Sequence, residues 1–418
     1  MRKFLLLFVI AFLNIAYVIG QNGANDKLQD IKYRRSSLHT ILLESDKFPY
    51  KDTVIGAYYK APFPDKYNNH DVGEKSFNPK NYGIDGDTTS TNIPLIIDKY
   101  LKDKKVANLM VAKWFDRAED GSFDMNLIGE RGSYNASEMQ AKIASNSARG
   151  LASLADAGEE LIGNTFVVVS KLNFISNEIP AKVILEASKI AASRISNSML
   201  RKVTEIAAEQ IYKKTREGYS VWTTSYLYKL AWNDSISSIF YNDLWIDKSN
   251  IDPAKKEKFD NTDLFSLQFV GSEKSRSLVT FSFKEKRSEE RYVEIATIRT
   301  IDNVYAKLQK KYDVFKTKTP LFTGDPITAK IGLKEGLESG DKFEVLEQTI
   351  DKEGKTKYVR KGTIKVDGKQ IWDNRYLAGQ ESIVDSTAAA VNAKPVLDRT
   401  FFKGGKDLYP GMLIRQIK

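Results

Sequence analysis

The chain has 418 residues, a net charge of +10 at neutral pH and no cysteine. The lack of cysteine excludes disulfides, thiolate catalysis and a lipid anchor attached to an N-terminal cysteine. The positive charge is spread along the sequence, which is typical of a solubilising surface but would also suit contact with anionic lipid, lipopolysaccharide or acidic glycan. We expect no nucleic-acid partner.

Residues 1–20 have the pattern of a secretory signal peptide. Arg2 and Lys3 precede an apolar run, and Val18 and Gly20 suit the positions before a cleavage site. The run is shorter than the ~20 apolar residues that span a bilayer, which favours cleavage over membrane anchoring. We therefore expect an exported mature chain, periplasmic or peripheral to the outer membrane, with no transmembrane segment.

The next part of the chain is predicted to contain little regular structure. Residues 21–30 are polar and are interpreted as a linker, and SLHTILLE at 37–44 is predicted to be a strand. Residues 47–91 are rich in proline, asparagine, aspartate, glycine and tyrosine. This composition predicts a long loop, which is either functional or draped over the surface.

A β-hairpin is predicted over residues 106–132. VANLMVAKWF at 106–115 is typical of a strand, and Asp120 with Gly121 supplies a turn. FDMNLIGERG at 123–132 then alternates apolar with polar residues, as the second strand of a hairpin does.

A helix that carries two glycines on its apolar side is predicted over residues 137–162. Gly150 and Gly158 share this side with leucines and isoleucines. Glycine costs about 1 kcal/mol in a helix interior, so we interpret both as sites of close packing and not as a ligand loop. The expected neighbour is the strand TFVVVSKLNF at 165–174, whose nearly continuous apolar start predicts burial on both faces.

Residues 178–217 are predicted to be a helical insertion, with Pro180 near its start and Gly218 at its end. The apolar stripe of the first half points almost opposite to that of the second half. Either the helix breaks at 196–198, or it is continuous and contacts different partners at its two ends. We favour the break and expect a helical hairpin or bend.

The segment YSVWTTSYLYKLAW at 219–232 is predicted to be a strand with an aromatic row on alternate positions. The row consists of Trp222, Tyr226, Tyr228 and Trp232. Such a row can bind sugar rings or a hydrophobic partner, so it is our candidate partner or glycan surface. Packing under neighbouring helices is the favoured alternative.

The rest of the chain is predicted to finish one domain and build a second. Strands are predicted at 263–271, 277–286 and 291–300, followed by a closing helix over 301–315. The last hundred residues contain short apolar runs separated by glycine and Asp-Gly turns, which predict a small antiparallel barrel or sandwich. We place the boundary near residues 316–319.

Residues that could carry metal or nucleophilic chemistry are scarce. The chain has two histidines, His39 in a predicted strand and His70 in a predicted loop, where a histidine is usually solvated. A shared zinc site would need a long-range coincidence, and there is no phosphate-binding loop or nucleophile elbow. We expect no metal and no cofactor.

Carboxylates are the remaining acid–base resource. They cluster in the predicted hairpin turn and near the end of the first helix, as Asp116, Glu119, Asp120, Glu159 and Glu160. A glycoside hydrolase needs two carboxylates that face each other across the scissile bond. Adjacent acids in turns are common, so we assign no catalytic residue.

Parts of the sequence resemble known families. The block VANLMVAKWFDRAEDGSFDMNLIGERGSYN, NTFVVVSKLNF and YVEIATIRTIDNVYAKLQKKYDVFK resemble exported Bacteroidota proteins of unassigned function. More distantly, the order of elements is similar to the α/β domain of the curli secretion component G and of penicillin-binding-protein activators. IGLKEGLESGDKFEV, GTIKV and LYPGMLI resemble the terminal β-module of flagellar assembly protein T. These relatives are scaffolds, channels or activators, and the resemblance implies no catalytic residues.

Together the patterns predict an α+β fold with two domains. A mixed sheet with packed helices is expected over residues 31–316, with the helical insertion at 178–217, and a β-module over 317–418. The predicted function is a non-enzymatic cell-envelope protein that acts in assembly or binding, with envelope proteins, glycan or further copies of itself as partners. The alternative is a carboxylate-dependent glycan hydrolase or a carbohydrate-binding protein.

Overall fold

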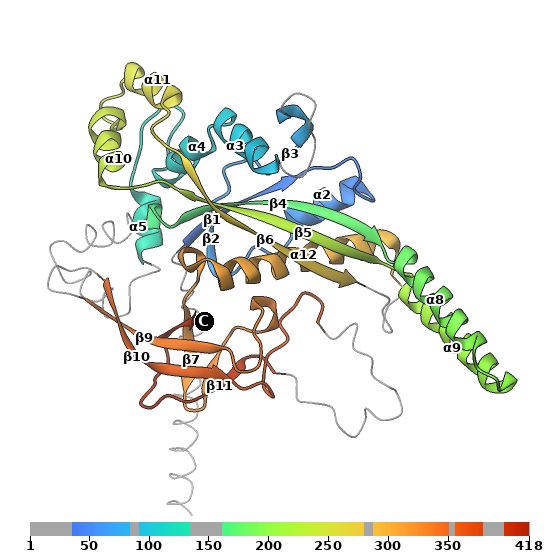
Figure 1. Ribbon diagram of the computed structural model, residues 1–418. Helices are drawn as coiled ribbons and strands as arrows, with labels where there is room; N and C mark the ends of the chain where they lie inside the picture. Colours follow the sequence, from blue (N-terminus) through green and yellow to red (C-terminus); the bar gives the residue numbers. More distant parts are fainter. Residues whose placement is uncertain are drawn as a thin grey trace, which may run out of the picture.

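The computed structural model describes residues 36–83, 92–133, 161–279, 287–350, 356–378 and 397–417. The fold is α+β, as predicted: a mixed sheet carries helices on both faces, and a closed antiparallel β-barrel follows it in the chain (Figure 1). The two parts have separate apolar cores, two on the faces of the sheet and one inside the barrel.

The body of the protein is built on a sheet with the strand order β2-β1-β4-β5-β6, in which β3 also pairs with β1. Its strands are β1 Ser36–Leu43, β2 Tyr67–Asn69, β3 Ser76–Phe77, β4 Thr165–Ser176, β5 Tyr219–Leu230 and β6 Leu267–Val279. Strand β1 runs parallel to β2, β3 and β4, whereas β4, β5 and β6 are antiparallel neighbours. The long antiparallel strands run alongside α12 and carry α8 and α9 at their far end (Figure 1).

Helices cover the two faces of this sheet. One face packs against α3, α4, α5, α11 and the π-helix η2, and the other against α2 and α12. The helices of the body are α2 Lys51–Lys60, η1 Pro79–Tyr82, α3 Ile93–Asp103, α4 Val106–Trp114, α5 Asn126–Ser133, α10 Asp234–Ile239, η2 Phe240–Leu244, α11 Pro253–Asn261, α12 Glu289–Lys311 and η3 Asp313–Phe315.

Strand β4 lies at the centre of the sheet, and its sequence accounts for that position. Val167 and Val169 point into one core, whereas Phe166 and Val168 point into the other. A strand that is covered on both faces needs apolar residues at consecutive positions. The predicted burial on both faces is therefore confirmed.

Two predictions for residues 47–132 are wrong. The predicted strand at 106–115 is helix α4, and the second strand of the predicted hairpin contains helix α5. The tract at 47–91, predicted to be mostly loop, begins with helix α2. Helix α4 is buried on most of its circumference, so its sequence shows no 3.6-residue apolar period.

A third wrong prediction concerns the segment before the second domain. The predicted strand at 291–300 belongs to the long helix α12, which continues through the helix predicted at 301–315. The segments at 263–271 and 277–286 contribute to one strand, β6, which ends at Val279.

The helix predicted over 137–162, with Gly150 and Gly158, lies outside the described residues except for its last two residues.

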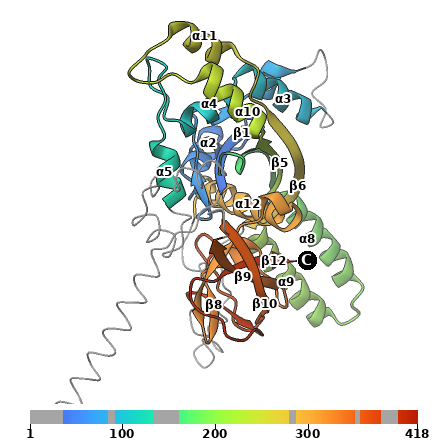
Figure 2. The ribbon, with the colours of Figure 1, turned by 90° about the vertical axis from the view of Figure 1, so that its left-hand side faces the viewer.

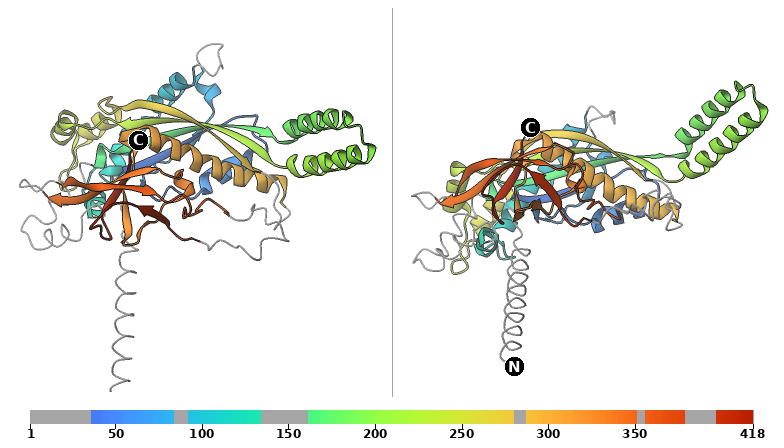
Figure 3. Two further views of the ribbon diagram at one scale, coloured as in Figure 1. Left: turned by 60° about the horizontal axis from the view of Figure 1, so that its bottom comes forward. Right: turned by 90° about the horizontal axis from the view of Figure 1, so that it is seen from below.

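The helical insertion forms a hairpin between β4 and β5. It consists of α8 Glu178–Ser193 and α9 Ser198–Thr215, so the predicted break is confirmed. The hairpin extends away from the rest of the molecule, beyond the ends of the strands that carry it (Figure 3). In the described part of the chain, no helix has both the length and the apolar character needed to cross a bilayer.

The barrel packs on the side of α12 that faces away from the sheet (Figure 2). Its strands are β7 Thr319–Gly324, β8 Ile327–Ala329, β9 Lys342–Ile350, β10 Thr356–Val366, β11 Thr400–Lys403 and β12 Leu413–Ile417. They close in the order β10-β11-β8-β7-β12-β9, and the short helix η4 Leu333–Glu335 packs on α12. Ion pairs from Lys310 to Asp341 (3.4 Å) and from Lys334 to Asp302 (3.9 Å) also join α12 to the barrel.

Candidate functional site

The hairpin formed by α8 and α9 carries the largest concentration of exposed apolar side chains. It contributes nine of the 21 exposed large apolar residues of the described chain, although it is a small part of it. These are Ile179, Val183, Ile184, Ile190, Met199, Leu200, Val203, Ile206 and Ile211. A contiguous exposed apolar surface marks a site of interaction, whereas scattered single residues do not.

The contact between the two helices of the hairpin is made mainly by small and polar residues. Ala181, Leu185 and Ala192 of α8 and Ala208 of α9 are the buried apolar residues. Lys189 and Glu209 form an ion pair of 2.6 Å across the hairpin. Apart from Leu185, most of the larger aliphatic side chains of the hairpin therefore remain on its outside.

The turn between the helices is held by specific hydrogen bonds. The side chain of Asn197 caps α9 by accepting from the backbone N–H groups of Met199 and Leu200, both at 3.0 Å. The guanidinium of Arg201 donates to the carbonyl of Ile195 at 2.8 and 3.0 Å. These contacts fix the reversal of the chain, so the hairpin has a defined shape.

The apolar stripe of each helix points away from the other helix. At 100° per residue, the centre of the exposed stripe lies about 180° from the centre of the buried residues on α8 and about 130° from the buried residue on α9. The outward positions are Val183 and Ile190 on α8, and Val203 and Ile206 on α9. The hairpin therefore has two apolar edges, one on each side.

A buried polar cluster, the neck, fixes the hairpin to the sheet. Asn177 lies between β4 and α8, is only 3% exposed and donates from Nδ2 to the carbonyls of Glu217 (3.0 Å) and Val279 (3.1 Å). Its Oδ1 accepts from Ser220 Oγ at 3.0 Å. Gly218 completes the neck, because a Cβ there would lie 2.1 Å from the carbonyl oxygen of Val279. The direction of the hairpin is thus set by the body.

The aromatic row does not form one surface. Tyr226 is 8% exposed and Tyr228 fully buried, both in the core between β5 and the helices, and Trp232 is partly buried against the same core. Only Trp222, near the hairpin end of β5, is exposed, and Arg276 packs 5.5 Å from its ring centre. The predicted surface therefore reduces to Trp222, and packing explains the other three residues.

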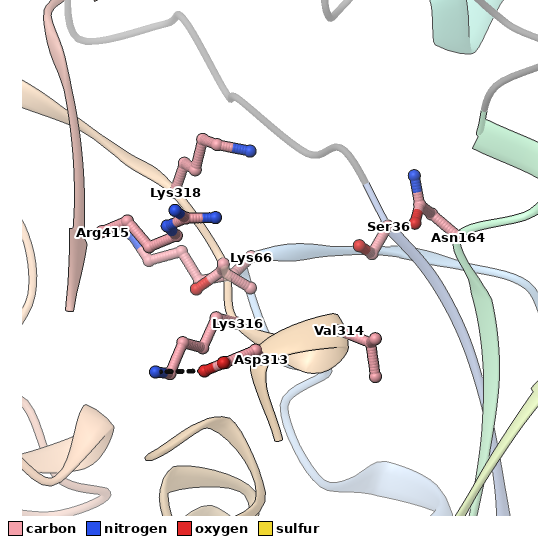
Figure 4. Close-up of a pocket in the computed structure, with 9 residues that line it drawn as sticks. Ser36, Lys66, Asn164, Asp313, Val314, Lys316, Lys318 and Arg415 are labelled. Carbon is pink, nitrogen blue, oxygen red and sulfur yellow. Dashed lines mark ion pairs between the residues drawn. The ribbon is translucent and has the colours of Figure 1, made fainter. Parts of the chain in front are cut away.

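The second candidate site is a basic pocket of about 180 Å³ between the body and the barrel (Figure 4). It is lined by Ser36, Lys66, Asn164, Asp313, Val314, Lys316, Thr317, Lys318 and Arg415. Lys316 pairs with Asp313 at 2.6 Å, and Arg415 pairs with Glu344 outside the pocket. The volume is below the 300–1,000 Å³ typical of small-molecule sites, so we assign it no ligand.

His70 is buried and held by a polar network, contrary to the expectation of a solvated loop residue. Its Nε2 donates to the carbonyl of Met110 (2.9 Å), and its Nδ1 accepts from Arg131 (2.7 Å), which also stacks on Trp114. Burial and the charge of Arg131 lower the pKa of His70 well below its usual value. The ring is thus a neutral link between β2, α4 and α5, with both nitrogens engaged.

Among the carboxylates predicted as an acid–base resource, Asp120 is bound in local structure. Asp120 accepts from the hydroxyl (2.7 Å) and the backbone N–H (2.9 Å) of Ser122, and these bonds lower the pKa of its carboxyl. A general acid needs the opposite shift. Glu159 and Glu160 lie outside the described residues.

The described part of the chain contains no group of three or more histidine, cysteine, aspartate or glutamate side chains placed to hold a metal ion.

No protein-family model matches the sequence, and no curated protein matches it. The sequence revealed both apolar stripes of the insertion, but not that they would be exposed.

Proposed function

We propose that this protein is an exported, non-enzymatic protein of the cell envelope that acts in assembly or binding, with the α8–α9 hairpin as its docking element. The observation that supports docking is the pair of exposed apolar edges on a hairpin whose direction is fixed by Asn177 and Gly218. The proposal of export rests on the pattern of residues 1–20. It includes the periplasm or the outer-membrane surface as the location.

A flexible or disordered arm would be a poor docking element, whereas this one is built to keep its shape. The turn at 195–201 is hydrogen-bonded, Lys189 and Glu209 pair across it, and the neck is buried. A rigid element with little apolar core of its own gains most stability when its outer faces are covered.

The glycan-active alternative has less support. Its aromatic platform is reduced to one exposed tryptophan, Trp222, and the pKa of Asp120 is lowered. A sugar-binding site needs an exposed ring beside convergent polar groups. We therefore favour docking through the hairpin over sugar chemistry.

The test is affinity capture of the tagged protein from the cells that produce it, after chemical crosslinking. The wild type is compared with a Val183→Glu/Val203→Glu variant, which places two charges on the apolar edges. We expect specific envelope proteins, or the chain itself, to be recovered in fixed ratio with the wild type and to be lost with this variant.

The matched control places the same two charges on exposed polar positions near the tip, as Ser193→Glu/Ser196→Glu. This control should recover the same partners as the wild type. Equal recovery from the edge variant and the control would contradict the assignment of the hairpin as the docking element.

A further inference from the structure

We propose that the hairpin docks on a bilayer surface rich in anionic phospholipid, with its apolar side toward the acyl chains and its charged side among the headgroups. This inference rests on the proposed docking role, because it names the partner for that surface. Docking on lipid would hold the chain beside proteins of the same membrane, so their capture from cells would also depend on the hairpin.

One broad side of the hairpin is apolar. On a helical wheel, Ile184 lies about 80° from the centre of the buried residues of α8. Leu200 and Ile211 lie about 60–80° from the buried residue of α9, rotated in the same sense. Because the helices are antiparallel, equal rotations from their contact point to the same side of the pair. These three residues, the apolar face, are between 54% and 57% exposed and lie between the two apolar edges.

The opposite side of the hairpin is charged. Its residues are rotated by about 80–120° in the other sense from the contact between the helices. They include Lys182 and Glu186 on α8, and Lys202 and Glu209 on α9. The hairpin as a unit is therefore apolar on three sides, which are the apolar face and the two edges, and charged on the fourth.

This three-sided pattern fits a fluid interface better than the surface of a folded protein. A rigid partner covers one side of a hairpin, whereas an interface into which the hairpin sinks covers the apolar face and both edges together. Interfacial helices sink about 5–10 Å, and a helix with its side chains is about 10–12 Å across. At that depth the three apolar sides are immersed and the charged side lies at the level of the headgroups.

The charge of the hairpin complements an anionic surface. Residues 178–217 contain eight lysines and arginines and five glutamates. All five glutamates lie in the half nearer the body, so residues 187–204, the distal half, carry four basic side chains and no acidic one. These are Lys189, Arg194, Arg201 and Lys202. An amphipathic helix with such an excess of basic residues is attracted to anionic lipid.

The distal half also has the means to reach a surface. Lys189 is paired with Glu209, but Arg194 and Lys202 are exposed near the turn. Beside them, Met199 is 79% exposed, the highest value among the exposed large apolar residues of the described chain. The hairpin is about 24–27 Å long and extends away from the sheet and the barrel (Figure 3). A bilayer can therefore meet the distal half before it meets the body.

The experiment measures flotation of the full-length mature chain with lipid vesicles. Vesicles of phosphatidylcholine mixed with phosphatidylglycerol are compared with vesicles of phosphatidylcholine alone. We expect binding to the anionic vesicles to be at least tenfold tighter. It should weaken at about 1 M salt, where the Debye length falls to about 3 Å.

Two substitutions test the apolar face. Ile184→Gln/Leu200→Gln should lower the affinity for anionic vesicles roughly tenfold or more, because two aliphatic side chains no longer leave water on docking. Ser193→Gln/Ser198→Gln places the same side chains at exposed positions on the charged side and is the matched control. This control should bind like the wild type, and circular dichroism verifies the fold of each variant.

A second pair of variants tests the charge. Arg194→Gln/Lys202→Gln should also weaken binding to anionic vesicles roughly tenfold, with little effect on phosphatidylcholine alone. Lys47→Gln/Lys104→Gln removes the same charge from exposed positions on the body and should bind like the wild type. The Ser193→Glu/Ser196→Glu chain keeps the apolar face and an excess of positive charge, so it should still bind.

Two results would overturn the inference. One is equal binding to both kinds of vesicle, and the other is an affinity unchanged by Ile184→Gln/Leu200→Gln. A chain that binds no vesicle but still captures envelope proteins through the hairpin would overturn lipid docking and leave the proposed docking function standing. Loss of both vesicle binding and capture would contradict both proposals.

Discussion

Asp302 lies on α12 at the junction with the barrel, in a site where a charged carboxylate is poorly solvated. Burial raises the pKa of its carboxyl to about 7, against the opposing effect of Lys334, whose Nζ is 3.9 Å away. The folded chain therefore holds this proton more tightly than the unfolded chain. Stability from this group is present at low pH and is lost as the pH rises through about 7.

Asp302→Asn should remove this dependence. The wild type should lose stability as the pH rises, whereas the variant should not, because asparagine cannot ionise. The free energy of unfolding of the variant minus that of the wild type should therefore increase by up to about 4 kcal/mol from pH 4 to pH 8. Urea denaturation at several pH values measures the difference. Asp52→Asn, at an exposed position, is the control and should change the free energy of unfolding by less than about 0.5 kcal/mol. A flat difference for Asp302→Asn would show that the carboxyl titrates normally.

The burial of His70 could not be predicted from the residues next to it in the sequence. Its neighbours Asn68, Asn69 and Asp71 are polar, which indicates a solvated loop. The ring is nevertheless buried beside Trp114, and Arg131, 61 positions later in the chain, donates to it. No local pattern carries that contact, so it could not be predicted.

At the scale of elements, the sequence predicted amphipathic segments well and fully buried helices poorly. The helices of the hairpin were found from their apolar stripes, including the break near residue 197. Helices α4 and α12 were missed in whole or in part, because their apolar residues surround the helix and include many β-branched side chains. Their burial between sheet, barrel and loops outweighs the strand propensity of these residues.

The neck of the hairpin gives a prediction at this scale. Asn177→Ala removes hydrogen bonds to two carbonyls and one hydroxyl at a buried position, so it should lower the free energy of unfolding by about 2 kcal/mol. Asn173→Ala, on the exposed side of β4, is the matched control and should change it by less than about 0.5 kcal/mol. Both are measured by urea denaturation, and equal losses would show that the neck does not anchor the hairpin.

At the scale of the molecule, the sequence predicted the order of parts but not their arrangement. The α+β class, the insertion and the terminal β-module were read from local patterns. The packing of the barrel on α12, and the projection of the hairpin from the far end of the sheet, depend on contacts between distant segments (Figures 1 and 2). For the candidate site, the sequence predicted the apolar stripes of the two helices. It did not predict that these stripes are exposed, because exposure depends on the whole fold.

We expect the apolar edges of the hairpin to be covered in the cell. Its most direct test is a photoreactive amino acid placed at position 190 or 203, compared with positions 182 and 202 on the polar side, in the cells that produce the protein. We expect adducts of one fixed mass from positions 190 and 203, and few adducts from positions 182 and 202. Equal labelling at all four positions, or no adduct from the edges, would contradict it.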